Sequence, residues 1–459
     1  MARGFPSRRV PEEKVRPSAT VILWRKAPAL EVFLVERSRQ TRFFPGYHAF
    51  PGGVLDAADG GGEDARARAA VRELEEETGV RLDPAALEPA GRIVTPPFGP
   101  VRYDTTFFMA ELPAGAQPKV DGQELVSGRW WRPEDALSRF EREAMPLPPP
   151  TLAYLRLLRA HNDARAAAEA ARATDNKPHH ERFRIEIHPG VYVLPLRAPT
   201  LPPATTQNCY LLDCDPILLI DPGSPDEDEH VALFHTLDQM LRENEREILV
   251  LLTHHHGDHI GAVEAVQRRY GVRVLASPET KEILPEHFVD GVVSEGHVFG
   301  VGEWAGKPWR VEVLHTPGHT PGHLAFRDMR WGAIFAGDLV SGVSTILIDP
   351  REGDMGRYMR SLERCSALEP RLVLPGHGPA TPRDAFGETL AHRRMREERV
   401  AAALTHEPQA PAAMLPAVYG DTPQEAWALA ETNLLSHLLH LEERGLAVRE
   451  KDGWRRPKR

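Results

Sequence analysis

The sequence predicts a multidomain chain of mixed α/β and α+β class, on the basis of three observations. Its 459 residues exceed what one ordinary core accommodates. The run MPLPPP at residues 145–150 interrupts the chain, because neither a helix nor a strand continues through so many prolines. Beyond that run, short apolar stretches alternate with polar helical stretches, which is typical of a layered α/β fold.

The composition is that of a globular protein, with 41% hydrophobic and 27% charged residues. A formal net charge of -10 argues against a chain coated with nucleic acid, but it allows a local basic patch. The three cysteines fit neither a zinc ribbon nor a disulfide framework, so reduced thiols are expected. The polar N-terminus lacks the apolar core of a signal peptide, and no apolar run could cross a bilayer. We therefore expect a cytoplasmic protein without a membrane partner, and nothing in the sequence indicates an oligomeric state.

Punctuation by proline and alanine divides the chain into four segments. Residues 17–146 open with the strand-like runs ATVILW and LEVFLVER and close with RWWRPEDAL. Residues 147–181, rich in Ala, Leu and Arg, are expected to form a helical connector or the last helix of the first segment. Residues 182–383 carry the alternating strands and helices, and residues 384–459 form a mainly helical tail.

The third segment contains a dense group of metal-ligand side chains. An apolar strand at 248–253 runs into His254-His255-His256-Gly257-Asp258-His259, and a helix then follows and ends at Gly271, a natural cap. Imidazole and carboxylate groups are the ligands that a hydrolytic zinc or iron site uses. A cation is expected here, because so many such groups within six residues would otherwise repel one another.

Three later stretches repeat the same order of apolar strand, tight turn and ligand side chain. VEVLHTPGH leads to His319, AIFAGD leads to Asp338, and RLVLPGH leads to His377. In layered α/β folds, the carboxyl edge of the strands is where ligands bind. Gly and Pro in the turns allow the backbone to bend sharply. The sequence therefore predicts that these groups gather at one edge.

Together these residues resemble the metallo-β-lactamase signature, over about residues 183–383. The resemblance implies a four-layer αββα fold with two metal ions, zinc or else iron or manganese. It implies that one metal is held by His254, His256 and His319, that a second is held by Asp258, His259 and His377, and that Asp338 bridges them. Asp258 would also orient the attacking water. Asp221 in ILLIDPG is expected to be structural, and His255, His315 and His323 are expected to hold no metal.

In the first segment, a helix expected from about residue 63 to Gly79 places three carboxylates on one face, those of Glu73, Glu76 and Glu77. Stacked carboxylates repel one another unless a divalent cation neutralises them. Oxygen ligands of this kind favour Mg²⁺ or Mn²⁺. A solvated acidic face is the alternative interpretation of such a run taken alone.

The stretch Arg72-Glu73-Leu74-x-Glu76-Glu77-x-Gly79-Val80 resembles the second half of the Nudix box, and the upstream FPGG and the later 124–136 stretch are similar to that family too. The resemblance covers about residues 17–146 and implies cleavage of a diphosphate linked to a nucleoside or coenzyme A. Arg72 would support the carboxylates by an ion pair, while Gly53 and Gly79 would support the turn and the helix end. The first half of the box departs from the pattern, because an insertion at 57–62 lengthens it and residue 63 or 64 takes the usual Glu place.

The tail resembles a winged helix, with helices followed by a strand–turn–strand at Asp452-Gly453. Residues 444–459 contain seven Lys or Arg against two acids, so the tail could meet RNA. A small helical cap over the active site is the alternative, and it is slightly favoured.

The first functional hypothesis is therefore a two-activity hydrolase acting on small molecules. The third segment would cleave a thioester, ester or phosphodiester, and the Nudix-like segment would cleave a diphosphate. Two alternatives remain: an endoribonuclease of single-stranded RNA, and a Nudix-like segment that binds a nucleotide without cutting it. A glyoxalase II-like glutathione thioesterase is less favoured, because that branch ends in a helical domain rather than a winged one.

Overall fold

The computed structural model describes residues 14–38, 46–62, 64–96, 101–120, 122, 124–175, 185–381 and 384–458. The chain divides into two compact units, residues 1–193 with 234–239, and the remainder. Among the described residues, no helix combines the length and the apolar character needed to span a membrane.

The first unit is built on a mixed sheet in which β1 and β6 run parallel at the centre. The strand order is β3-β2-β1-β6-β5, with β4 paired to β1 and β7 to β2. The strands are β1 (Lys14–Lys26), β2 (Leu30–Arg37), β3 (His48–Ala49), β4 (Gly52–Val54), β5 (Glu88–Val94), β6 (Val101–Glu111) and β7 (Leu125–Trp131). The helices are η1 (Ala57–Asp59), α1 (Ala65–Thr78), η2 (Pro84–Ala86), α2 (Pro133–Glu141), α3 (Pro149–His161) and α4 (Ala164–Arg172).

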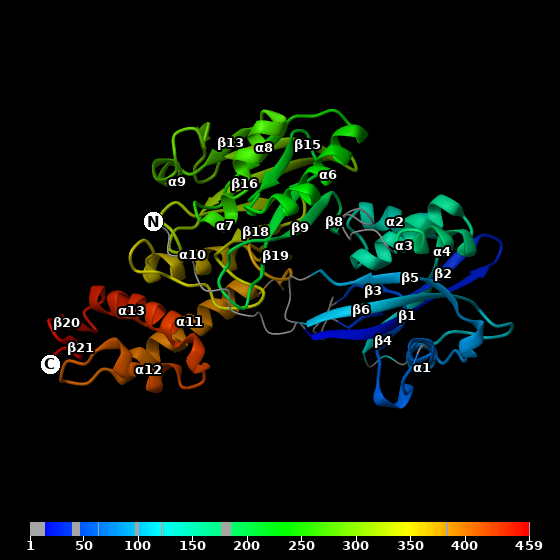
Figure 1. Cartoon of the computed structure of the whole chain (residues 1–459), viewed down its shortest axis with the longest axis horizontal. Coiled ribbons are helices and arrows are strands. Elements are labelled where there is room, and N and C mark those ends of the chain that lie inside the picture. The colour runs from blue at the N-terminus through cyan, green and yellow to red at the C-terminus, as the bar shows by residue number, and fades with distance from the viewer. Residues whose placement is uncertain are drawn as a thin grey trace. The chain divides into compact units, whose positions relative to one another are not determined.

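Alternation along β1 gives this sheet two buried faces. Val21 and Leu23 point into a core cluster that includes Leu74 of α1, whereas Ile22 belongs to the cluster formed with α2, α3 and α4. Figure 1 shows α1 on one side of the sheet and these three helices on the other. Tyr154 of α3 anchors its helix by donating from Oη to the Ala90 carbonyl oxygen at 2.7 Å. Of the two interpretations of residues 147–181, the packing of α3 and α4 favours helices that complete the first unit.

Two further sheets carry the strands that precede the predicted metal ligands. Their orders are β14-β13-β12-β11-β10-β9-β8 and β15-β16-β17-β18-β19. The first contains β8 (Glu186–His188), β9 (Val191–Arg197), β10 (Thr206–Leu212), β11 (Ile217–Ile220), β12 (Ile248–Leu251), β13 (Arg273–Ala276) and β14 (Gly291–Val292). The second contains β15 (Val298–Trp304), β16 (Lys307–His315), β17 (Leu324–Asp328), β18 (Ala333–Gly337) and β19 (Leu372–Pro375).

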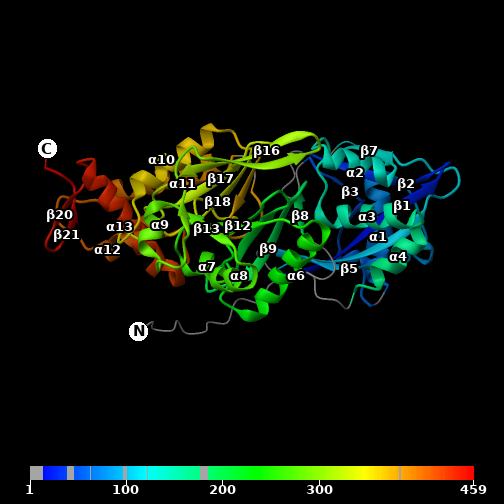
Figure 2. The same cartoon turned by 90° about the horizontal axis from the view of Figure 1, so that it is seen from above.

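Helices cover these sheets on their outer sides, which gives the expected αββα layering. They are α6 (Glu227–Glu243), α7 (Gly257–Ile260), α8 (Val263–Tyr270), α9 (Pro278–Ile283) and α10 (Met355–Ala367). Tyr210 of β10 and Phe335 of β18 meet edge to face with ring centroids 5.1 Å apart, which joins the two sheets. Tyr358 and Leu362 of α10 pack in one core cluster with Ile334 of β18 (Figure 2).

The C-terminal part consists of α11 (Ala385–Ala403), α12 (Pro411–Tyr419), η3 (Gln424–Ala426), α13 (Trp427–Glu443), β20 (Val448–Glu450) and β21 (Gly453–Arg455). β20 and β21 form the expected antiparallel hairpin. Helix α11 belongs to two cores, because Phe386 packs with β18 and α10 while Val400 packs with α12 and α13. The C-terminal helices are thus attached to the sheet that carries Asp338.

Candidate functional site

The structure gathers all seven predicted ligands of the second unit at the ends of its strands. His254 and His256 follow β12, His319 follows β16, Asp338 follows β18, and His377 follows β19. Asp258 and His259 lie on the short helix α7 that continues the β12 loop. The edge that the sequence predicted is therefore the edge at which these side chains meet.

The first cluster contains three imidazoles. His256 Nδ1 lies 3.0 Å from His254 Nε2 and 3.0 Å from His319 Nε2. These three nitrogens are mutually close enough to share one ion. This is the ligand set that the resemblance implied for one metal.

The second cluster contains Asp258, His259 and His377, and Asp338 lies between the two clusters. His377 Nε2 is 3.5 Å from Asp258 Oδ2. Asp338 Oδ1 lies 3.4 Å from His259 Nε2 and 3.3 Å from His377 Nε2. Its other oxygen, Oδ2, lies 3.6 Å from His319 Nε2 of the first cluster. The two oxygens of one carboxylate therefore face different clusters.

Asp221 and Thr253 fix the tautomers of two of these rings. His259 Nδ1 lies 2.8 Å from Asp221 Oδ2, so it carries the proton and leaves Nε2 with a free lone pair. Thr253 Oγ1 donates to Asp221 Oδ2 at 2.6 Å, so it accepts from His254 Nδ1 at 2.9 Å. The same reasoning then leaves His254 Nε2 unprotonated. Asp221, expected to be structural, thus orients the candidate ligand His259 through the ring nitrogen that faces away from the clusters.

Main-chain carbonyl groups fix two further rings. His319 Nδ1 lies 2.9 Å from the Leu347 carbonyl oxygen, and His377 Nδ1 lies 3.0 Å from that of Thr206. A carbonyl oxygen only accepts, so each Nδ1 donates and each Nε2 presents its lone pair to the clusters. Such outer partners are the usual means of orienting histidine ligands.

Glu352 is the partner that sequence reasoning missed. Its Oε1 lies 3.0 Å from His256 Nε2 and its Oε2 lies 3.1 Å from His255 Nε2. Hydrogen bonds from these two histidines hold the pKa of Glu352 well below its usual range. His256 therefore presents Nδ1 to the first cluster. His255, expected to hold no metal, lies with His256 and Glu352 in a further group of close ligand atoms. The pair is separated by almost a hundred residues, so no local motif signals it.

Burial and mutual charge determine the protonation states of the site. Burial lowers the pKa of His319 to about 4 and that of His254 well below its usual value, so both rings are neutral near pH 7. Burial alone would raise the pKa of Asp338, but His377 and His259 hold it well below its usual range. Burial alone would lower the pKa of His259 and His377, but the Asp338 carboxylate raises both, and Asp221 adds to this at His259. Metals bind neutral imidazoles and ionised carboxylates, so a cation in the second cluster would displace a proton.

The residues present fit divalent cations. His259 Nε2 and Asp338 Oδ1 are buried and have no hydrogen-bond partner within the described structure. Unprotonated nitrogens of the first cluster face one another at 3.0 Å. Their lone pairs repel one another, and a cation bound between them would relieve this repulsion. A Cβ at Gly376 would approach Asp338 Oδ1 to 2.6 Å, so this turn admits only glycine next to the ligands.

The remaining predicted non-ligands lie outside the clusters. His315 Nε2 lies 3.2 Å from the Pro321 carbonyl oxygen. His323 is fully buried, and its Nε2 accepts from the Asp338 main-chain N–H at 3.1 Å. It holds no position in either cluster, but it does fix the turn that carries Asp338.

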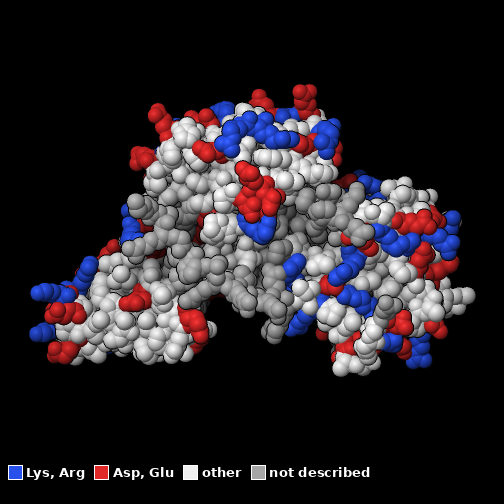
Figure 3. All heavy atoms as spheres, viewed as in Figure 1, with Lys and Arg blue, Asp and Glu red and all other residues white. Residues whose placement is uncertain are grey.

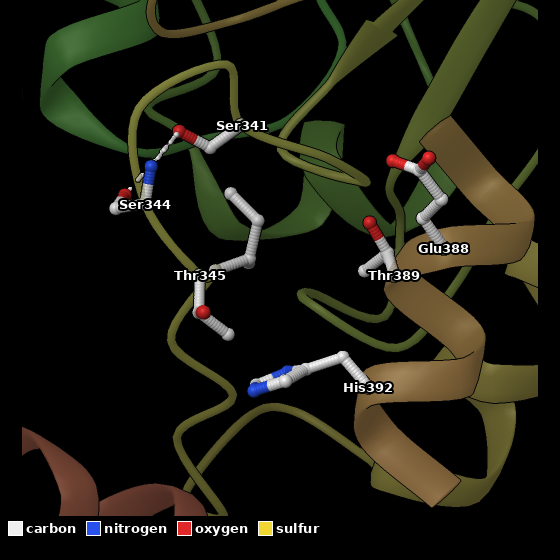
Figure 4. A pocket seen from close by; sticks show the side chains of 7 residues that line it. Ser341, Ser344, Thr345, Glu388, Thr389 and His392 are labelled. Carbon is white, nitrogen blue, oxygen red and sulfur yellow. Dashed lines mark hydrogen bonds between the residues drawn. The ribbon is translucent and has the colours of Figure 1, made fainter. Parts of the chain in front are cut away.

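A cavity of about 210 Å³ lies against the loop that follows Asp338. Figure 4 shows Ser341, Ser344 and Thr345 on this loop, with Glu388, Thr389 and His392 of α11 across the cavity. The next residue after Ser341 donates its main-chain N–H to the carbonyl oxygen of His377 at 2.8 Å. One wall of the cavity is thus attached to the loops that carry two ligands.

In the first unit, Arg72 gathers the acidic side chains of α1. Its guanidinium lies 2.9 Å from Glu73 Oε1, 3.0 Å from Glu76 Oε2 and 2.9 Å from Asp59 Oδ1. Asp59 belongs to η1, which the insertion at 57–62 forms, and sequence reasoning did not single it out. Arg72 thus makes the expected ion pairs and one more.

Glu77 is set apart from the other two glutamates. Its Oε2 accepts from the Gly52 main-chain N–H at 3.0 Å, and burial raises its pKa to about 8. A Cβ at Gly53 would lie 2.5 Å from the Glu73 carboxylate, which explains the glycine there. Among the described residues, the groups of ligand atoms within 4.8 Å of one another all lie in the second unit. Glu73, Glu76 and Glu77 share a helix but are not gathered in this way.

The ends of α1 are defined at Gly79 and residue 64. Gly79 adopts a left-handed conformation with φ 70° and donates its N–H to the Glu75 carbonyl oxygen, as a helix-ending glycine does. Asp64 is the N-cap residue of the helix and makes no side-chain capping bond. Residue 63, the other candidate for the usual Glu place, lies outside the described residues.

Comparison with known proteins identifies three domains. The chain matches the NUDIX domain over residues 14–151, the metallo-beta-lactamase superfamily over 202–377, and the beta-lactamase associated winged helix domain over 410–454. These matches follow the order in which the sequence predicted the three folds.

Individual relatives match parts of the chain. A protein of Drosophila melanogaster named Beta-lactamase-like protein 2 homolog is 29% identical over 250 residues, 52% of this chain and 82% of its own length. A hydroxyacylglutathione hydrolase of Cereibacter sphaeroides is 33% identical over 144 residues, 31% of this chain and 52% of its own length. The crystal structure of a beta-lactamase domain protein from Burkholderia ambifaria, 23% identical with a TM-score of 0.50, covers 62% of this chain and 98% of its own and shares the fold. The chain is therefore a hydrolase that contains, in this order, a Nudix domain, a metallo-β-lactamase domain and a β-lactamase-associated winged helix domain.

Proposed function

We propose that the metallo-β-lactamase domain hydrolyses a thioester, or a related ester or phosphodiester, with two divalent cations of zinc, iron or manganese. The observation that carries this proposal is the placement of Asp338, whose two carboxylate oxygens face the two ligand clusters. Cations bound in such a pair of sites supply a water of lowered pKa and neutralise charge that develops on the substrate.

The chain's own residues would hold and orient the reactants. In each of five imidazoles one ring nitrogen is bound to an outer partner, so the other nitrogen would be the one to bind a cation. We assign Asp258 to the second cluster and to orienting the attacking water, since its carboxylate is only partly buried beside His377. Separate nucleophilic Ser or Cys side chains are not required in this scheme.

A thioester is the substrate class we favour. The hydroxyacylglutathione hydrolase that resembles residues of this domain is named for the removal of an acyl group from glutathione. This chain continues into a winged helix domain, which argues for a different carrier of the acyl group. The cavity against the loop that follows Asp338 is lined by hydroxyl groups, Ile346, Glu388 and His392, whose pKa burial lowers to about 4, and so could receive a polar part of the substrate.

Single-stranded RNA is the alternative substrate, and the C-terminal charges weaken the case for it. Arg444 pairs with Glu397, and Arg455 pairs with Glu450, so part of the basic tail is already neutralised. Figure 3 shows acidic and basic side chains lying side by side over the C-terminal part of the face in view. A strongly basic track would suit a phosphate backbone better.

For the Nudix domain we propose cleavage of a diphosphate linked to a nucleoside or coenzyme A, with Mg²⁺ or Mn²⁺ at Glu73, Glu76 and Glu77. Desolvation and the nearby Glu73 carboxylate raise the pKa of Glu77, and a cation among these carboxylates would relieve that cost. Arg72, tied to Asp59, would keep Glu73 and Glu76 in place. A domain that binds the nucleotide without cutting it is the alternative.

The test is a hydrolysis panel on the purified full chain. Acyl-coenzyme A, acyl-glutathione, coenzyme A itself and single-stranded RNA are offered to the wild type, His256→Ala and Glu77→Gln. We expect thioester cleavage to fall by roughly a hundredfold or more only in His256→Ala, and diphosphate cleavage only in Glu77→Gln. RNA cleavage lost in His256→Ala would overturn the thioester assignment. Nucleotide binding without turnover in the wild type would overturn the Nudix activity.

A further inference from the structure

The segment at residues 346–354 supplies hydrogen-bond acceptors to two of the three histidines of the first cluster. The Leu347 carbonyl oxygen accepts from His319 Nδ1 at 2.9 Å, and the Glu352 carboxylate lies 3.0 Å from His256 Nε2. Both bonds hold the ring nitrogen that faces away from the cluster. The orientation of these two rings therefore depends on where the segment lies.

This segment has little regular structure of its own, because residues 345–349 belong to neither a helix nor a strand. Its main-chain groups need other partners, and helices α11 and α13 provide them. Asn433 Oδ1 accepts from the Ile348 N–H at 2.9 Å, and Ser436 Oγ donates to the Ile348 carbonyl oxygen at 2.5 Å. The Arg393 guanidinium donates to the carbonyl oxygen of Ile346. The C-terminal helices thus hold the chain on both sides of Leu347.

These contacts lie in the interior of the protein. Arg393 is 1% exposed, Ser436 is 3% exposed, and Ile348 is fully buried. A buried polar group that loses its partner is costly, since water cannot replace the bond. The side chains of Arg393, Asn433 and Ser436 therefore fix the segment far more firmly than surface hydrogen bonds would.

The second cluster has different anchors. His377 is held by the Thr206 carbonyl oxygen, and His259 is held by the Asp221 carboxylate. Thr206 begins β10 and Asp221 directly follows β11, so neither anchor belongs to the segment that α11 and α13 hold. A change in these helices should therefore act on one cluster and spare the other.

We propose that the C-terminal helices α11 and α13 position the first metal cluster, with Arg393, Asn433 and Ser436 as positioning residues for His319 and His256. The proposal rests on the proposed function in taking the clusters to be metal sites. It assigns to the C-terminal helices a part in metal retention, in addition to any part in substrate binding.

The experiment measures zinc affinity of the full chain by competition with a chromophoric chelator. The double variant Asn433→Ala/Ser436→Ala is made in two backgrounds, His377→Ala, which keeps the first cluster, and His256→Ala, which keeps the second. We expect the dissociation constant to rise about tenfold in the first background and to stay within about twofold in the second. Leu438→Ala, a truncation in the apolar core of the same helix, controls for general loosening and should not discriminate between the clusters.

A second measurement needs no metal. In the metal-free chain with an intact site, the ring Nδ1–H of His319 should be protected from exchange with solvent, as followed by NMR with labelled histidine. The double variant should lose this protection, and Ser436→Thr, which keeps the hydroxyl, should retain it. Equal zinc affinities in both backgrounds, or unchanged protection of His319, would overturn the inference. Failure of the wild type to bind zinc, with His319 protection responding as expected, would instead count against the proposed function.

Discussion

Asp221 shows how a single carboxylate can organise the site without touching a metal. It accepts from the Thr253 main-chain N–H at 2.7 Å, from the Thr253 hydroxyl and from His259. Through the threonine hydroxyl it also determines the tautomer of His254. One side chain thus orients a ligand in each cluster.

Replacement of this carboxylate is the sharpest test at the scale of a residue. Asp221 has φ 50°, a conformation that Asn tolerates nearly as well as Asp, so Asp221→Asn avoids backbone strain. The amide cannot accept all the bonds that the carboxylate accepts, and we expect zinc affinity to fall by about 10–100-fold. Chelator competition measures this, with Asp213→Asn, whose carboxylate pairs with Arg246, as the control. Unchanged zinc affinity in Asp221→Asn would contradict the orienting role.

Residue patterns predicted the candidate ligands but not their outer hydrogen-bond partners. The order of strand, turn and ligand side chain recurs locally, so His319, Asp338 and His377 could be predicted from the sequence. Glu352 meets His255 only once the chain has folded, and it follows no strand. His323 looked like a spare histidine because its partner is a main-chain N–H, which no sequence motif records.

At the scale of an element, α11 and α13 are joined by a buried ionic cluster. Glu397 Oε2 of α11 lies 2.7 Å from His440 Nδ1 and 3.4 Å from His437 Nδ1, and Oε1 pairs with Arg444. Burial alone would raise the pKa of Glu397, but the bonds from His437 and His440 outweigh it and lower the pKa to about 2. Burial also lowers the pKa of His437. The cluster thus favours an ionised Glu397 among hydrogen-bond donors.

This cluster predicts the response of the C-terminal helices to acid. A depressed pKa stabilises the folded state above the unfolded value of about 4.3, and that contribution is lost as pH falls towards about 2. Glu397→Gln should therefore lower the stability of α11–α13 near pH 7 and flatten its fall between about pH 4.5 and 2. Hydrogen exchange of the amides in these helices measures it, beside the exposed neighbour variant Glu398→Gln. Parallel pH profiles for wild type and Glu397→Gln would show that the cluster has no such effect.

Elements with a clear period or turn could be predicted, whereas their tertiary roles could not. The hairpin of β20 and β21 follows from the Asp452-Gly453 turn, and α1 from its acidic face and its terminal glycine. The insertion at 57–62 carries no such signal, yet it forms η1 and brings Asp59 to Arg72. Such tertiary roles depend on packing against an element distant in the sequence, and the local residue pattern holds no information about that packing.

At the scale of the whole chain, three domains carry two separate kinds of candidate site. The candidate ligands of the metallo-β-lactamase domain are mainly nitrogen atoms, for which we propose zinc, iron or manganese. The candidate ligands of the Nudix domain are carboxylate oxygens, for which we propose magnesium or manganese. The order of these folds was predictable because each has a dense local motif. The extent of the first domain was harder to predict. The sequences of α3 and α4 would suit a helical connector as well as a part of the core, and only the folded structure shows them packed in the core.

The central claim, that seven residues of the metallo-β-lactamase domain hold two metal ions, is tested most directly by metal content. Elemental mass spectrometry of the purified full chain, after extensive dialysis, gives the number of tightly bound transition-metal ions per chain for the wild type and for Asp338→Ala. The geometry predicts about two ions in the wild type and a clear loss in Asp338→Ala, because this carboxylate faces both clusters. A wild type without stoichiometric metal, or an Asp338→Ala variant with undiminished metal content, would contradict the account.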